Sequence, residues 1–308
     1  MNQINFMLFL FATLCTLVPS IIAVLPGTWP AINVPPPVNA NYSRLVNTTK
    51  IRNAPVSRVN ATCPTTDTYC YWSCTTCMRN DTDIYRCPNK LDWGLTLDDG
   101  PSPFTTIVLD YLATQNVKIT FFVIGSNVYQ YPEILQRAYK EGHQIAVHTW
   151  SHPMLTTQNT DQVIAELMYT IDAIKAAINV TPTYMRPPFG DYDDRIRDIS
   201  TQLGMKPTIW DLDTNDWMSA DDPTFQISWV AANFTKWVAD PALTSTGHIS
   251  LEHDIYNQTA AQIPLVVPIL KKANYNIKPL YQCMGNSPYK ENNKHLVELP
   301  YHTDFWLT

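Results

Sequence analysis

Two adjacent aspartates stand at the end of an apolar run in the stretch GLTLDDGPSP, residues 94–103. Consecutive residues of a strand point to opposite faces of the sheet, so Asp98 and Asp99 are not expected to share a role within a strand. Gly100 and Pro101 indicate that the strand ends there. An isolated Asp-Asp-Gly is typical of a turn, so the pair becomes informative only beside the other polar residues of the chain.

A histidine pair follows in the stretch HTWSH, His148 to His152. This i, i+4 spacing allows one helical turn or a tight loop to direct both imidazoles at a single ion. The zinc-peptidase motif has a glutamate directly after its first histidine, whereas Thr149 stands here, so a third ligand and a base must come from elsewhere. Asp98 and Asp99 can supply both, one as the ligand and the other as the base that takes a proton from water. The spacing leaves open which aspartate has which role.

Seven apolar runs predict the strands that position these residues. The runs are 91–97, 119–124, 144–148, 183–186, 208–212, 248–251 and 277–281. Segments with helical periodicity lie between them, and Gly142 and Gly204 stand where helix C-caps are expected. One such helical segment has an apolar stripe of Val163, Ile164, Leu167, Ile171 and Ile174. Alternating strands and helices predict an α/β fold with a parallel sheet, either open or closed as a barrel.

Polar side chains gather at the carboxyl ends of these predicted strands. They are Asp98, Asp99, His148, His152, Arg186, Asp213, Asp216, Glu252, His253 and Asp254. Both β/α barrels and open α/β sheets build their sites at this end of the strands. Structural polar residues would be scattered, so the clustering favours a functional interpretation.

The first 23 residues are predicted to be a signal peptide. FMLFLFATLCTLV is an apolar core of signal-peptide length, followed by Pro19 and the small Ala23. It is short for a membrane-spanning helix, which needs about 20 apolar residues. The final stretch PYHTDFWLT has no hydrophobic tail of the kind that is exchanged for a lipid anchor. We expect a secreted protein, extracellular or in the cell wall.

Sequons and cysteines support the secretory route. Asn-x-Ser/Thr sequons stand at Asn41, Asn47, Asn60, Asn80, Asn179, Asn233 and Asn257, and Pro182 weakens the Asn179 sequon. The cysteines beyond the predicted signal are Cys63, Cys70, Cys74, Cys77, Cys87 and Cys283. A disulfide framework is favoured over a zinc knuckle for CYWSCTTC in such a chain. Five clustered cysteines cannot pair entirely among themselves, so we expect Cys283 to pair with one of them; the connectivity stays open.

The chain divides into four predicted segments. After the signal peptide at 1–23, residues 24–89 form a glycosylated, disulfide-tied extension rich in Pro, Asn and Thr. One domain spans 90–283, and a tail follows at 284–308. The net charge of −6 is spread without basic blocks, which argues against nucleic acid as a partner. We expect a monomer, and its many Tyr and Trp residues are either core or platforms for sugars.

Five motifs occur in the order found in the polysaccharide deacetylase (NodB-homology) family, carbohydrate esterase family 4. They are TLDDG, HTWSH, RPPFG, DLDTNDW and ISLEHD. The resemblance covers residues 91–281, and the cysteine-rich segment resembles that of secreted fungal chitin deacetylases. It implies a distorted (β/α) barrel of about seven strands with an N-terminal extension. It also implies one divalent metal, with zinc as the first choice and cobalt as the alternative.

The resemblance implies roles for the residues of the reacting centre. Asp98 matches the catalytic base of the family and Asp99 the metal carboxylate. His148 and His152 match the metal imidazoles, and His253 matches the general acid.

Further matches concern orientation and substrate contact. Arg186 matches the arginine that orients the base, and Asp216 its acidic partner, with Asp213 as the alternative. Phe189 stands where Tyr is common, and its backbone N–H fills the oxyanion role equally well. Two further residues, Trp217 and Leu251, match the walls of the acetate pocket in the family. Glu252 replaces the apolar residue that bacterial members have before the histidine, which changes the local electrostatics.

The implied function is metal-dependent removal of N-acetyl groups from the N-acetylglucosamine residues of chitin, giving chitosan and acetate. An acid at His253 favours an amide substrate, because an amine anion is a poor leaving group and must be protonated as it leaves. Acetate esters are not excluded as substrates. Peptidoglycan and acetylated xylan are alternative substrates. A non-haem iron oxygenase also uses two histidines and a carboxylate, but gives Asp98 no role. A glycan-binding wall glycoprotein without catalysis is the alternative from another class.

Overall fold

The structure is a computed structural model that describes residues 24–59 and 61–291. The predicted signal peptide at 1–23, the Asn60 sequon and the predicted tail from residue 292 onward lie outside the described residues. In the part that is described, no helix combines the length and the hydropathy needed to cross a membrane.

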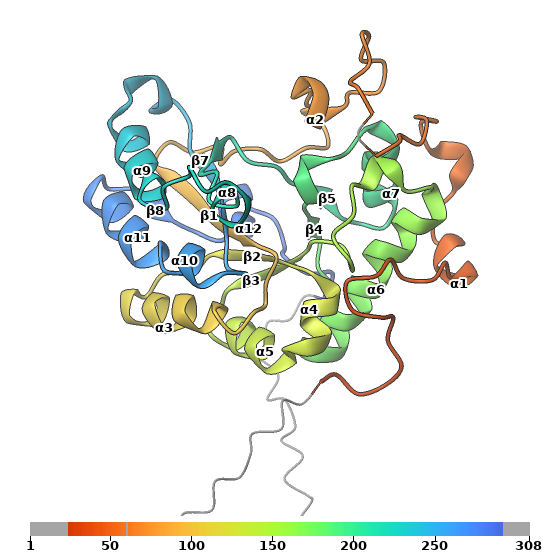
Figure 1. Ribbon diagram of the computed structural model, residues 1–308, viewed down its shortest axis with the longest axis horizontal. Coiled ribbons are helices and arrows are strands. Elements are labelled where there is room, and N and C mark those ends of the chain that lie inside the picture. Colours follow the sequence, from red (N-terminus) through yellow and green to blue (C-terminus); the bar gives the residue numbers. More distant parts are fainter. Residues whose placement is uncertain (1–23, 60, 292–308) are drawn as a thin grey trace, which may run out of the picture.

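A curled parallel sheet forms the centre of the fold (Figure 1). Its strands are β1 (Asp92–Asp98), β2 (Thr120–Val123), β3 (Gln144–Val147), β4 (Tyr184–Met185), β5 (Lys206–Pro207), β6 (Leu212–Asp213), β7 (His248–His253) and β8 (Asn276–Ile277). The strand order is β5-β4-β3-β2-β1-β7-β6, and β8 also pairs with β1. Since β5 and β6 end this order, the sheet is a distorted, open barrel, as the motifs imply.

Register brings the polar strand ends together. The strand β1 lies between β2 and β7, and Asp98 stands opposite both Phe122 and His253. On the other side, Val147 pairs with Met185, so His148 and Arg186 leave neighbouring strands at the same level. The expected clustering at the carboxyl end of the sheet is confirmed.

Helices surround the sheet (Figure 1). The α-helices are α1 (Ala40–Ser43), α2 (Trp72–Thr75), α3 (Thr105–Gln115), α4 (Gly125–Gln130), α5 (Pro132–Lys140), α6 (Thr160–Ile178), α7 (Asp194–Gln202), α8 (Met218–Asp221), α9 (Trp229–Ala239), α10 (Asn257–Ala260), α11 (Ile263–Lys272) and α12 (Leu280–Met284). Short 3₁₀ turns are η1 (Thr48–Lys50), η2 (Leu155–Thr157), η3 (Pro188–Gly190) and η4 (Pro241–Leu243).

The longest helix, α6, follows from local sequence. Asn159 and Gln162 form a reciprocal capping box at its start, and Asn179 ends it in the left-handed region at φ 56°. Its predicted apolar stripe is buried in the main core. The expected caps at Gly142 and Gly204, with φ 89° and 81°, are also confirmed.

The predicted strand at 208–212 is wrong. The chain instead forms β5 before this run and β6 at its end. Between them, Ile84 of the extension donates its N–H to the Pro207 carbonyl (2.9 Å) and accepts from the Ile209 N–H (2.7 Å). The Thr208 N–H still donates to the Met185 carbonyl of β4 (2.8 Å), whereas the Asp211 N–H donates to the Ile249 carbonyl of β7 (3.1 Å), so the run changes from one neighbouring strand to another.

The predicted strand at 277–281 is also wrong beyond Ile277. Pro279 cannot donate a hydrogen bond to a strand ladder, and it stands at the N-cap of α12. Its carbonyl accepts from the Cys283 N–H (3.2 Å), so the chain turns into a helix.

The extension shares the core of the domain. Leu25 and Val46 are buried in the main apolar cluster, and Ile84 belongs to a second cluster. The disulfides are Cys63–Cys74, Cys70–Cys77 and Cys87–Cys283. The expected pairing of Cys283 with the cluster is confirmed, and disulfides replace the zinc-knuckle alternative.

Candidate active site

A cleft of about 570 Å³ opens at the carboxyl ends of the strands. The predicted site residues that line it are Asp98, Asp99, His148, His152, Phe189, Asp213, Trp217, Leu251 and His253. Arg186 and Asp216 are fully buried behind the lining. The structure therefore brings the predicted site residues into one place.

Adjacent aspartates can face the same cleft because the backbone turns between them. Asp98 is the last residue of β1, whereas Asp99 has the left-handed φ of 76° and leaves the strand. Gly100 follows, and a Cβ at this position would lie 2.6 Å from the Asp254 carboxylate. The Asp-Asp-Gly sequence thus fits a turn that a larger third residue would obstruct.

Three side chains form a possible metal site, namely Asp99, His148 and His152. Oδ1 of Asp99 lies 3.3 Å from Nε2 of His148 and 3.2 Å from Nε2 of His152. Tetrahedral zinc with ligands at about 2.0–2.1 Å places ligand atoms about 3.3–3.4 Å apart. Oδ1 of Asp99 is buried and lacks a hydrogen-bond partner among the described residues. The two imidazoles and one carboxylate therefore fit a divalent cation.

The ring nitrogen of His148 that does not face Asp99 is bound to a backbone carbonyl group. Its Nδ1 lies 2.8 Å from the Arg186 carbonyl oxygen, which accepts a hydrogen bond from an Nδ1–H. This tautomer leaves the lone pair of Nε2 directed toward Asp99. The arrangement is the one that a metal-binding imidazole requires.

A buried carboxylate on α6 holds the loop between the two histidines. Glu166 accepts hydrogen bonds from the N–H groups of Trp150 (2.8 Å) and Ser151 (2.9 Å) and from the Ser151 hydroxyl (2.6 Å). Glu166 is completely buried. The motifs did not include it, although a charged residue beside the apolar stripe of α6 was a signal.

Four residues in or beside the cleft have a strained backbone conformation. Residues other than glycine rarely adopt a positive φ. The φ values here are 76° for Asp99, 66° for Thr149, 59° for His152 and 59° for Phe189. Each such residue costs about 1–3 kcal/mol, and such residues collect at functional sites. The strain supports a functional interpretation of this end of the sheet.

The Asp98 carboxylate is held by a buried arginine. Nη1 of Arg186 donates to Oδ1 of Asp98 (2.7 Å) and to Oγ1 of Thr96 (2.7 Å). The guanidinium also lies over the Phe122 ring, 4.1 Å from its centroid. Burial lowers the pKa of Arg186, and the negative charge of Asp98 opposes that change. The expected orientation of Asp98 by Arg186 agrees with this geometry.

The expected pairing of Asp216 with Arg186 is wrong. The Asp216 carboxylate instead accepts from Nδ1 of His253 (2.7 Å) and from the His253 backbone N–H (2.8 Å). The alternative, Asp213, accepts from the Asn215 N–H (2.8 Å) and forms no ion pair with Arg186 within the described residues. Burial lowers the pKa of Arg186, and the negative charge of Asp213 is one of those that oppose this change.

Asp216 favours the cationic form of His253. Burial lowers the pKa of His253, but the charge and hydrogen bond of Asp216 outweigh burial, and the pKa rises to about 10. Burial also raises the pKa of Glu252 well above its usual value, which favours the neutral acid. The unusual glutamate therefore adds little charge beside His253.

Comparisons with known proteins agree with this geometry. Residues 85–208 match the family model described as polysaccharide deacetylase. Chitin deacetylase 1 of Cryptococcus neoformans var. grubii is 42% identical over 287 residues, covering 85% of this chain. This chain spans 60% of the length of that relative.

Solved structures show the same fold. A chitin deacetylase from Colletotrichum lindemuthianum has a TM-score of 0.63 at 28% identity, covering 71% of this chain and 100% of that one. The peptidoglycan deacetylase PdaC from Bacillus subtilis has a TM-score of 0.56 at 32% identity, covering 64% and 92%. On this agreement of sequence, fold and site, the chain belongs to the polysaccharide deacetylase family, carbohydrate esterase family 4.

Proposed function

We propose that the protein removes N-acetyl groups from N-acetylglucosamine residues of chitin, releasing acetate and leaving chitosan. One observation carries this proposal. A single cleft holds an arginine-bound carboxylate, a possible metal triad and an aspartate-bound histidine. These are the base, the cation site and the acid that amide hydrolysis needs.

The metal triad would consist of Asp99, His148 and His152. A divalent cation held there supplies Lewis acidity, which polarises an acetyl carbonyl and acidifies water. Two nitrogen ligands and one oxygen ligand with room for water suit zinc, with cobalt as the alternative.

Other groups of the cleft perform the proton transfers and bind the acyl group. Asp98 takes the proton of the attacking water, and Arg186 holds this carboxylate in its orientation. The Phe189 N–H donates to the oxygen that gains negative charge. His253 then protonates the leaving nitrogen while the C–N bond breaks, and Asp216 stabilises its cationic form. The walls of the acetyl pocket are Trp217 and Leu251.

The test is an acetate assay with N-acetylglucosamine oligomers, carried out with and without a chelator. We expect acetate release that the chelator stops and added Zn²⁺ or Co²⁺ restores. No release by the metal-loaded protein would reject the proposal. Peptidoglycan fragments and acetylated xylan tested in parallel distinguish the alternative substrates, since PdaC is described as a peptidoglycan deacetylase.

Two further alternatives fit the site less well. An iron oxygenase would use the triad but would leave Asp98, Arg186 and His253 without a role. A glycan-binding protein without catalysis would not require the base, the acid and all three ligands together. The site therefore favours hydrolysis.

Secretion and domain boundaries are also part of the proposal. We infer a signal peptide at 1–23, an extension at 24–89, a catalytic domain at 90–283 and a tail at 284–308. Three disulfides support an oxidising, extracellular or cell-wall location. Intact mass of the secreted protein before and after deglycosylation tests the cleavage site and sequon occupancy, and light scattering tests the monomer.

A further inference from the structure

Trp72 lies in the wall of the cleft, although it belongs to the extension. Its ring packs edge-to-face against Trp210, with 5.0 Å between centroids. A Cβ at Gly190 would lie 2.1 Å from the Trp72 ring, so the indole lies directly on the turn that contains Phe189. The side chain remains partly exposed. An indole from the extension therefore borders the space that contains the metal triad.

The neighbours of Trp72 fix its position. The backbone N–H of Trp72 donates to the Tyr192 carbonyl (3.1 Å). On either side, the hydroxyls of Tyr71 (2.9 Å) and Ser73 (3.0 Å) donate to the same oxygen of Asp191. The backbone that carries the indole is thus bound to the chain segment directly after η3.

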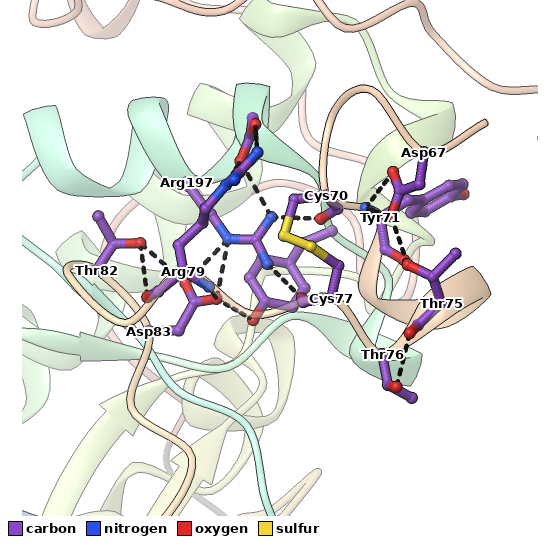
Figure 2. Close-up of a disulfide and its surroundings, with 12 residues drawn as sticks. Asp67, Cys70, Tyr71, Thr75, Thr76, Cys77, Arg79, Thr82, Asp83 and Arg197 are labelled. Carbon is purple, nitrogen blue, oxygen red and sulfur yellow. Dashed lines mark hydrogen bonds and ion pairs between the residues drawn. A yellow bond between two sulfur atoms is a disulfide. The ribbon is translucent and has the colours of Figure 1, made fainter.

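A buried cation anchors the loop around α2 (Figure 2). Arg197 on α7 is completely buried and donates to the carbonyl oxygens of Cys70 and Cys77, which a disulfide joins. Its Nε also lies 2.9 Å from the Asp83 carboxylate. The loop is therefore fixed before any substrate arrives, which lowers the ordering cost of binding.

We propose that Trp72 is a substrate-binding residue on which a sugar ring of the polysaccharide packs, so that the extension completes the cleft. This inference rests on the proposed function. A β-linked pyranose has apolar C–H faces and a polar rim, and an indole buries such a face while its N–H meets the rim. A small acetate ester has no sugar ring to place against Trp72.

The test compares a long substrate with a short one. Trp72→Ala should lower kcat/KM for a chitin tetramer about 10–50-fold, mainly through KM, because an apolar contact is lost. The kcat/KM of this variant for an aryl acetate should stay within about twofold of that of the unmodified protein. This result would also show that the variant is folded. Trp72→Phe should recover most of the activity on the tetramer. Trp229→Ala removes another exposed tryptophan, 49% accessible and outside the cleft lining, and should change neither value.

Two results would overturn the inference. Equal losses on both substrates would mean that Trp72 positions the reacting groups, and no loss on either would mean that it does not contact the glycan. Failure of the proposed function has a different signature, because the unmodified protein would then leave chitin oligomers intact. If it deacetylates another glycan instead, the same comparison on that glycan decides the role of Trp72.

Discussion

The Asp216–His253 pair predicts a pH-dependent defect. In Asp216→Asn, the side chain keeps its size but loses the charge that raises the pKa of His253 to about 10. If that pKa returns to about 6.5, the protonated fraction at pH 8.5 falls from about 97% to about 1%. Amide cleavage should then fall about 100-fold at pH 8.5, but less than about twofold at pH 6.

The sign of the effect follows from the proton that His253 donates. Only the protonated form is active, so the loss should grow as the pH rises above the lowered pKa of His253. The assay is kcat/KM for a chitin tetramer between pH 6 and 9, with an aryl acetate as control. The ester should show a much smaller loss, because its leaving group needs no proton. A loss on the tetramer that stays constant with pH would refute the assigned role of Asp216.

Three other predictions concern the ligands, their support and the extension. Asp99→Ala should lose the metal, whereas Asp98→Asn should keep it and lose activity about 10²–10⁴-fold; a metal-free Asp98→Asn protein would contradict this assignment. Glu166→Gln should lower metal affinity about 10–100-fold in chelator competition, because the loop between the histidines loses the negative charge and one of the two acceptor oxygens that hold it; unchanged affinity would show that Glu166 has no such role. Replacing Cys87 and Cys283 by serine should lower the free energy of unfolding by about 5 kcal/mol in the chain-entropy model, because the bond spans 196 residues. Denaturant unfolding measures it, and an unchanged free energy would contradict that model.

Much of the site could be predicted because parallel strands have a common direction. Because seven apolar runs alternate with helices, the polar residues at their carboxyl ends are expected to meet, and six of those ten residues line one cleft. Periodicity did not reveal long-range hydrogen bonds. The expected strand at 208–212 is divided because Thr208 bonds to Met185 of β4 and Asp211 bonds to Ile249 of β7, and no local pattern in that run indicates this change of partner.

The missed residues reflect the same limit. Trp72 enters the cleft because disulfides and Arg197 position a segment that has little periodicity of its own. Asp216 was assigned to the wrong cation because DLDTNDW contains several acids, and the direction of a loop is not encoded in their spacing. Tertiary contacts decide both cases.

The different roles proposed for the two aspartates agree with their different partners. Asp98 has a buried arginine bound to Oδ1, which fixes the carboxylate in the wall of the cleft. Oδ1 of Asp99 has only two imidazole nitrogens nearby and no hydrogen bond within the described residues, so it is free to bind a cation. The positive φ of Asp99 changes the direction of the backbone between the two residues, so their carboxylates have different surroundings. Two adjacent acids can therefore act as base and ligand because strand β1 ends between them.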